Sequence, residues 1–494
     1  SARLITGIFD TLNKQLTQSG KEVFIYELLQ NANDYPRRDK TSRSAIPVDV
    51  EFHITDEFLT FQHSGEYFNP KNIAAICSIN DGEKSANAEA IGYKGIGFKT
   101  VFLDNDYVYL SSGNYSFRFD KSATDVNNTP WQILPVWTEL REIDATVRNI
   151  FSCHPNDEFR VKFALKPRDK RILLKNARSD NYIDLFSSVF DSERVILFIP
   201  NIRKVSVFLN DSSRPYIVRE KNTDSWCVSD SMLADVPDFV RERVNEALTN
   251  QDAEISDGYD RIPEKYLNFY RTSVKFACKR SGRKLHPVDD AILYCYLPAK
   301  RADWGFKFLM NTDMVPNGPR DDIEDIELNH EIAKIAGRQF FFWIKQLIKS
   351  KAYDLDSIFA LIPDFEECKN RRVYRQFIEE FQEEFEALIK TEAFVPAVDG
   401  NGSMVYKCIS EIINDMTGIT ANSVMSDKDF LNLLELNGCY LPDNELRNSS
   451  SFNKFLYKHS PSELDINIDT IDLTDKKTLD LFKDAYTSGI FQFE

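Results

Sequence analysis

The chain has 494 residues, which is too many for a single hydrophobic core, so two or three domains are expected. Hydrophobic residues make up 42% and charged residues 28%, as in soluble globular proteins, and no apolar run reaches the roughly 18 residues of a membrane span. The formal net charge of −16 argues against nucleic acid as the main partner, because phosphate binding needs a positive surface.

The eight cysteines are scattered along the chain without a CxxC pair. This scatter argues against both a zinc site and a disulfide framework, and it predicts a reducing, cytoplasmic location. The start at Ser1 has no charged-then-apolar signal pattern.

Helices followed by antiparallel strands are predicted for the first part of the chain. Apolar residues at helical spacing predict one helix over 4–16 and a second from about Lys21 to Tyr35, which Pro36 ends. Alternating apolar and polar residues predict a strand at 48–54, and a returning strand at 58–62 is expected after the turn at Asp56-Glu57. A second hairpin is expected from 107–110 and 115–119. This order indicates an α+β sandwich rather than a doubly wound sheet.

The pattern changes near residue 150. Strands of a second, mixed domain are expected at 159–165, 195–209, 273–278, 291–297 and 306–310. From about Leu328 the chain turns helical, with an apolar stripe made by Val373, Phe377, Phe381, Phe385 and Leu388. We therefore expect a first domain over 1–150, with room for its last strands to extend to about 210. A second mixed α/β domain over 151–345 and a mainly helical region over 346–494 follow it.

The strongest chemical signal lies on the second predicted helix. Glu27, Asn31 and Asp34 are spaced i, i+4 and i+7, so a helix places them on one stripe. An amide oxygen can ligate Mg²⁺, and a carboxylate one turn away can orient and deprotonate a water. The alternative is a solvated polar face with the same spacing.

A second signal is a glycine-rich stretch with Gly92, Gly95 and Gly97, followed by an apolar run. Glycine lets backbone N–H groups approach phosphates closely, and the N-terminus of a helix favours an anion. The preceding residues, 78–90, are small and polar, as in a lid over a nucleotide. The alternative is a turn without a ligand.

The two signals, in this order, resemble the GHKL superfamily of DNA gyrase, heat-shock chaperone ATPases, histidine kinases and MutL. The resemblance implies a Bergerat-type α/β sandwich that binds ATP with Mg²⁺. It makes Glu27 the general base, Asn31 the Mg²⁺ ligand and Asp34 a support of the polar network below the nucleotide. The nucleotide-binding set that it implies is Asn31, Asp34, His63, Gly65, Gly92, Lys94, Gly95, Ile96, Gly97, Phe98 and Lys99.

One motif departs from that family. Between the two signals the family has Asp-x-Gly-x-Gly, whose Asp accepts a hydrogen bond from the adenine amino group. Here His63 stands at the Asp position, Gly65 is kept and Tyr67 replaces the second Gly. A neutral imidazole can accept or donate, so base selectivity stays open. The departure, with the sequence 72–79 and the glycine stretch, resembles the sacsin-type and No-vein-type ATPases.

A third match lies at 309–323, which resembles the middle-domain loop of the heat-shock chaperones. The resemblance implies that Arg320 contacts the γ-phosphate, and a guanidinium suits bidentate contact with phosphate. The alternatives are an ion pair of Arg320 with Asp321 or Asp322, or a phosphate contact from Lys300 or Arg301.

The resemblance implies an ATPase whose hydrolysis drives a conformational cycle, with a chaperone-like or remodelling role. It also implies a protein client or partner subunit and is compatible with a homodimer, and prokaryotic members of the subgroup often accompany anti-phage modules. The alternative from another class is a nucleotide-gated interaction module that does not hydrolyse ATP. A histidine kinase would carry its phospho-accepting His on a helix before the Glu27–Asp34 stretch, and no His precedes His53, so this function is excluded. The acidic net charge and the loss of the family's Asp argue against a topoisomerase or mismatch-repair subunit.

Overall fold

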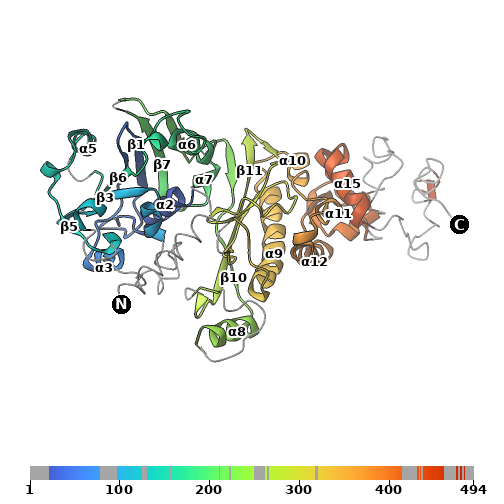
Figure 1. The fold of residues 1–494 in the computed structure, drawn as a ribbon. Helices are drawn as coiled ribbons and strands as arrows, with labels where there is room; N and C mark the ends of the chain where they lie inside the picture. Colours follow the sequence, from blue (N-terminus) through green and yellow to red (C-terminus); the bar gives the residue numbers. More distant parts are fainter. Residues whose placement is uncertain are drawn as a thin grey trace.

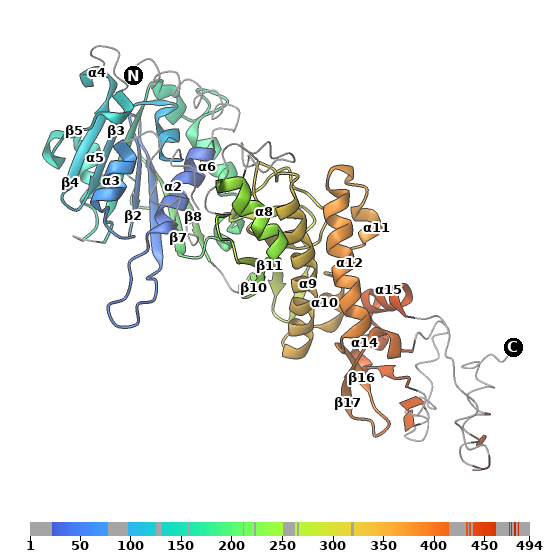
Figure 2. The ribbon, with the colours of Figure 1, turned by 90° about the horizontal axis from the view of Figure 1, so that it is seen from below.

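The computed structural model shows three units in chain order along the molecule, each with its own sheet (Figures 1 and 2). The residues that it describes are 22–77, 97–124, 131–155, 158–210, 212–221, 224–249, 262–263, 266–317, 321–413, most of 431–460 and a few isolated positions beyond. The helix predicted over 4–16 lies outside these residues. The mixture of helices and sheets confirms the α+β class.

The first unit is built on an eight-stranded sheet of order β5-β4-β3-β6-β2-β1-β7-β8. Every neighbouring pair is antiparallel except β1 and β7, which run parallel. The strands are β1 Val48–Ile54, β2 Leu59–His63, β3 Asn105–Ser112, β4 Tyr115–Asp120, β5 Val136–Trp137, β6 Val161–Pro167, β7 Ile202–Leu209 and β8 Ile217–Glu220.

Both faces of this sheet are covered. Alternation in β1 turns Val50 and Phe52 toward a core that also contains residues of α2, α3, η2, α6 and α7. A smaller cluster on the other face contains Val147 and Phe151 of α5. The helices of this unit are α2 Val23–Asp34, α3 Pro70–Cys77, η2 Gly97–Phe102, α4 Lys121–Thr124, η3 Trp131–Ile133, η4 Leu140–Glu142, α5 Ala145–Phe151, η5 Lys170–Leu173, α6 Tyr182–Val189 and α7 Arg194–Leu197.

The first sheet extends beyond residue 150, into the range to about 210 that the sequence left open, and takes in two strands expected in the second domain. β6 lies between β3 and β2, and β7 pairs with β1, so the sheet continues to β8 at Glu220. The start of the strand expected over 195–209 is helical instead, in α7. Alternation identifies a strand but not its sheet, because strand pairing joins residues far apart in the sequence.

The second unit has a seven-stranded sheet with the path β10-β11-β15-β13-β14, and β9 and β12 also pair with β11. Its core stacks Phe276 on Trp343 of the long helix α9, with ring centroids 5.3 Å apart. The elements are β9 Trp226–Val228, β10 Met232–Asp235, β11 Arg271–Ser281, β12 Lys284–His286, β13 Leu293–Cys295, β14 Leu297–Pro298, β15 Leu309–Asn311, α8 Asp238–Thr249 and α9 Glu327–Ser350.

The third unit is mainly helical and packs on α9. Phe377, Phe381 and Phe385 of α12 are buried, as the predicted stripe requires, whereas Val373 precedes α12 and is 81% exposed. A three-stranded sheet β17-β16-β18 completes the unit. Its elements are α10 Leu355–Phe359, α11 Phe365–Cys368, η8 Arg372–Tyr374, α12 Arg375–Thr391, β16 Val395–Val398, β17 Met404–Lys407, η9 Ile409–Glu411, β18 Leu441–Pro442, α14 Asn444–Arg447 and α15 Ser450–His459.

None of the helices in the described part of the chain combines the length and the apolar character that crossing a bilayer requires.

Candidate functional site

Helix α2 of the first unit contains Glu27, Asn31 and Asp34, the polar residues that the sequence predicts to lie on one stripe. Its Phe24, Leu28 and Ala32 are buried in the core, as the apolar stripe predicts. Glu27 is 8% exposed, whereas Asn31 and Asp34 are half-buried at the C-terminal end of the helix. The three polar side chains thus extend from the protein interior toward its surface along one helix.

Hydrogen bonds to the sheet fix the position of this helix. The Asn33 side-chain oxygen accepts from the backbone N–H of Asn201 at 2.9 Å, and the Asn201 side chain donates to the Asn33 carbonyl at 2.8 Å. Asn201 immediately precedes β7, so the end of α2 is attached to the central strands. The Asn33 amide also donates to the Asp34 carboxylate at 3.2 Å, so these contacts help to orient Asp34.

The 3-10 helix η2 packs directly against α2. It starts at Gly97, and its Val101 and Phe102 share one core with Leu28. The two sequence signals, about 70 residues apart (97 − 27 = 70), therefore meet in space. Gly92, Lys94, Gly95 and Ile96 lie outside the described residues, as do the side-chain surroundings of Gly97 and Phe98.

Lys99 points into the protein at this junction. Its ammonium donates to the carbonyl of Ile76 at 2.5 Å and to that of Gln132 at 3.1 Å. Burial lowers the pKa of Lys99 to about 8. Because Ile76 lies in the last turn of α3, the cation stabilises the negative end of that helix and ties η2 to α3. In this conformation Lys99 positions the loop rather than extending toward a ligand.

The end of β2 approaches the end of α2. A Cβ on Gly65 would lie 2.7 Å from the Tyr35 carbonyl oxygen and 2.8 Å from His63 Nδ1, so only glycine fits there without a shift. The N–H of Glu66 donates to the same Tyr35 carbonyl at 2.7 Å. His63 and Gly65 are thereby placed beside the helix that carries Asp34.

His63 is fully buried, and its Nδ1 accepts a hydrogen bond from the Gly65 N–H at 3.2 Å. An accepting ring nitrogen carries no hydrogen, so in the neutral imidazole the proton is on Nε2. That nitrogen is a donor. The sequence left open whether His63 accepts or donates a hydrogen bond toward a base. Because Nδ1 already accepts from the Gly65 N–H, that choice narrows toward donation by Nε2.

The second unit contacts α2 through the segment 294–300. Lys300 Nζ lies 2.8 Å from the Glu22 carboxylate, just before α2, and Leu297 belongs to the core of the first unit. The Tyr296 hydroxyl donates to Asp313 at 2.7 Å. Burial, then the charge and hydrogen bond of Asp313, and also the charge of Asp34, raise the pKa of Tyr296 well above its usual value. Lys300 therefore reaches the helix that carries the candidate base.

Arg320 lies outside the described residues, but its flanks are defined. Pro316 and Ile323 form an antiparallel bridge at the base of the loop. The Asp321 carboxylate accepts from the Asn317 amide at 2.8 Å and lies 3.7 Å from Arg301. The Asp322 carboxylate accepts from the Tyr374 hydroxyl at 2.8 Å. Both acids proposed as ion-pair partners of Arg320 thus have contacts to other residues.

Asn201, Tyr296 and Asp313 are positioning residues that the sequence analysis did not identify. Asn201 is 168 residues from its partner Asn33, and no local motif contains both. Tyr296 has a positive φ of 66°, an uncommon conformation for a residue with a side chain, but φ cannot be read from sequence. Only the contacts of the folded chain reveal these three.

Comparison with known proteins gives two similarities. Residues 451–494 match the family model of the bacterial DNA polymerase III alpha subunit finger domain, a short C-terminal stretch outside the candidate site. Protein NO VEIN of Arabidopsis thaliana is 25% identical over 312 residues, which cover 61% of this chain and 10% of that protein. The chain thus matches only a tenth of that protein's length, and the relationship is distant. It agrees with the resemblance to No-vein-type proteins.

Proposed function

We propose that the first unit is a GHKL-type sandwich that binds ATP with Mg²⁺ and hydrolyses it. The observation that supports this most is the packing of α2 against η2, which brings the Glu27–Asn31 stripe beside the end of the glycine-rich stretch. A base, an amide oxygen and a loop of backbone N–H groups are what phosphoryl transfer to water requires. Distant similarity to Protein NO VEIN is compatible with the proposal.

The side chains at this site suit a Mg²⁺ ion that is bound jointly by the protein, phosphate oxygens and waters, rather than by the protein alone. The described residues contain no group of three or more His, Cys, Asp or Glu side chains arranged to hold a metal ion. Mg²⁺ in nucleotide sites is held by one or two protein oxygens, phosphate oxygens and waters rather than by a cage of side chains. The Asn31 amide oxygen would supply the protein ligand, and the bound ion would neutralise phosphate charge.

Glu27 is the proposed base. Its carboxylate is nearly buried on a helix that the Asn33–Asn201 bonds fix to the sheet, so its direction is set before substrate arrives. It would orient the attacking water and take its proton. Asp34, at the end of the same stripe, would support the polar network below the nucleotide.

His63 would meet the base of the nucleotide. With its proton on Nε2, the imidazole would donate a hydrogen bond to the base, whereas the family's Asp accepts one from the adenine amino group. A donor at this position favours an acceptor on the ring, so the preference for adenine is weakened. This observation also keeps the non-hydrolysing, nucleotide-gated module as the second candidate.

Hydrolysis would act on the second unit through the segment 294–300, which contacts Glu22 just before α2. ATP would close the lid over the site, Arg320 or Lys300 would sense the γ-phosphate, and hydrolysis would release the contact. A protein client or partner subunit would use this cycle, in remodelling or in antiviral defence, and a homodimer would be compatible with it.

Glu27→Gln tests the proposal. It keeps the size and hydrogen bonding of the side chain but removes the base, so ATP hydrolysis should fall by about a hundredfold or more while nucleotide affinity stays within about threefold. Glu57→Gln, at a half-buried carboxylate on the β1–β2 turn that pairs with Lys170, is the control and should hydrolyse at the wild-type rate. Steady-state phosphate release and nucleotide titration measure both. Hydrolysis by Glu27→Gln at the wild-type rate would contradict the assignment, and binding without hydrolysis in the wild type would favour the second candidate.

A further inference from the structure

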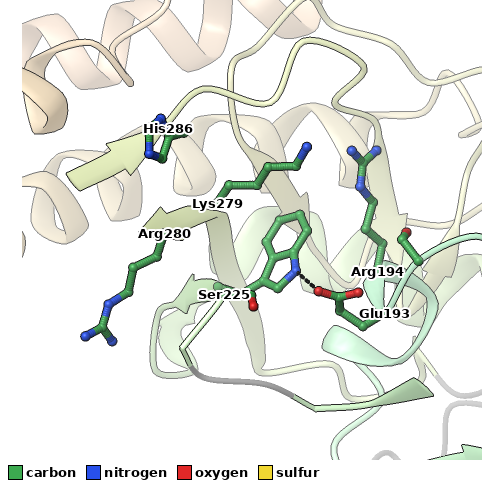
Figure 3. Close-up of a pocket in the computed structure, with 8 residues that line it drawn as sticks. Glu193, Arg194, Ser225, Lys279, Arg280 and His286 are labelled. Atoms are coloured by element: carbon green, nitrogen blue, oxygen red, sulfur yellow. Dashed lines mark hydrogen bonds between the residues drawn. The ribbon is translucent and has the colours of Figure 1, made fainter. Parts of the chain in front are cut away.

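A cavity of about 410 Å³ lies where helix α7 of the first unit meets strands β9, β11 and β12 of the second. Its lining comes from both units and consists of Ser192, Glu193, Arg194, Ser225, Trp226, Lys279, Arg280 and His286 (Figure 3). Beside it, Leu197 and Phe198 of the first unit share an apolar cluster with Trp226 and Ala277 of the second. The cavity therefore sits at the joint between the two units.

The lining is basic although the chain as a whole is acidic. Four of the eight lining residues are Arg, Lys or His, and the only carboxylate among them is Glu193. That carboxylate accepts a hydrogen bond from the Trp226 indole at 2.8 Å. Figure 3 shows the charged ends of Arg194 and Lys279 directed to the same side, whereas the Arg280 guanidinium points away from them. The positive charge of the cavity is thus concentrated at Arg194 and Lys279.

A carboxylate outside the lining marks where an anion is attracted. Arg194 donates to both oxygens of Asp290, at 2.7 and 2.9 Å. Its hydrogen bonds lower the pKa of Asp290, and the charge of Lys279 contributes in the same direction. The Asp290 side chain is 73% exposed, however, so this ion pair is only weakly stabilising and can be exchanged.

We propose that this cavity binds a small phosphorylated ligand, whose phosphate lies between Arg194 and Lys279 in place of the Asp290 carboxylate. A phosphate dianion carries more charge and more acceptor oxygens than a carboxylate, and guanidinium groups bind it in bidentate geometry. The volume is within the range of small-molecule sites. Because the lining comes from both units, the bound ligand stabilises their present arrangement. This site is separate from the proposed ATP site on α2.

Two charge changes of opposite expected effect test the proposal. Inorganic tripolyphosphate is titrated into the full chain by calorimetry, at constant ionic strength and without divalent metal. Lys279→Glu should weaken binding by about tenfold or more, whereas Asp290→Asn removes the competing carboxylate and should strengthen it by about threefold. Lys284→Glu, an exposed charge reversal on the same hairpin but outside the lining, should bind like the wild type.

If Lys279→Glu and Lys284→Glu weakened tripolyphosphate binding equally, the effect would be general charge attraction and the proposal would be overturned. Unchanged or weaker tripolyphosphate binding by Asp290→Asn would also overturn it. Gly97→Val, at the start of η2, separates this site from the proposed ATP site, because a branched Cβ there would hinder phosphate at the glycine-rich stretch with or without metal. If Gly97→Val removes tripolyphosphate binding and Lys279→Glu does not, the probe binds at the proposed ATP site and the cavity proposal is wrong. Thermal melts of each variant verify that it is folded.

Discussion

At the scale of single residues, the end of β2 is constrained by close packing. Gly65 lies where any side chain would meet the Tyr35 carbonyl and the His63 ring, and its own N–H fixes the tautomer of that ring. One backbone position thus sets both the distance between β2 and α2 and the hydrogen-bonding role of His63. A substitution at Gly65 acts on the position of α2 and on the hydrogen bonding of His63 together.

Gly65→Ala should lower the free energy of unfolding by about 1–3 kcal/mol, because the added methyl group forces the backbone or the ring to move. In a His63→Ala background the cost should be smaller, since one of the two close contacts is gone. Urea unfolding of the two single variants and the double variant measures the coupling. Gly282→Ala, with no atom within 4 Å of its Cβ, should combine additively with His63→Ala. Strict additivity at Gly65 as well would argue against the contact.

At the scale of elements, α9 and α12 cross closely enough that one glycine is required. A Cβ on Gly337 would lie 2.2 Å from the Phe381 carbonyl oxygen. Near this crossing, His330 of α9 stacks on Phe377 of α12 with ring centroids 4.1 Å apart. The His330 ring nitrogens lie 2.7 Å from Glu380 and 2.8 Å from Asp325. The crossing therefore contains a histidine between two carboxylates.

This histidine makes the stability of the helix pair depend on pH. Burial by itself lowers the pKa of His330, but hydrogen bonds to Glu380 and Asp325 outweigh it, and the net pKa is raised above 6.5. Because the pKa of His330 is higher in the folded state, its protonation stabilises that state. This contribution is fully present below the pKa of the unfolded chain and is lost as the pH rises through the pKa of the folded state. His330→Gln should therefore destabilise more at about pH 6 than at about pH 8.

Urea unfolding at the two pH values measures this difference. The control is the Glu380→Gln background, which removes the carboxylate that lies 2.7 Å from His330. In that background His330→Gln should show a smaller difference between the two pH values. An equal loss of stability at both values for His330→Gln would mean that stacking on Phe377, and not the charge, is the contribution that matters.

At the scale of the whole molecule, local patterns predicted the elements better than their assembly. Helix α2, strand β1 and the β3–β4 hairpin follow from periodicity, because one buried face imposes it. The sequence left open which sheet β6 and β7 join, since it allowed the first domain to end near 150 or near 210, because the parallel pairing of β1 with β7 spans about 150 residues (202 − 48 = 154). The same is true of the candidate site. Motif spacing identified Glu27 and Asn31, but the Asn201 contacts that fix the end of α2 arise only on folding.

One leucine of the second unit packs into the first unit and contributes to the joint between them. Leu297 lies on β14, in the second sheet, yet it is 7% exposed and packs in the core of the first unit. Leu297→Ala would leave a cavity in that core, and such changes cost about 2–5 kcal/mol. Because the contact spans both units, the loss should also separate their unfolding into two transitions in a thermal melt. Leu233→Ala, on β10 of the same sheet at 60% exposure, should change stability by less than about 0.5 kcal/mol. If both variants unfolded alike in a single transition, Leu297 would not join the units in solution, and the route proposed from α2 to the second unit would have to run elsewhere.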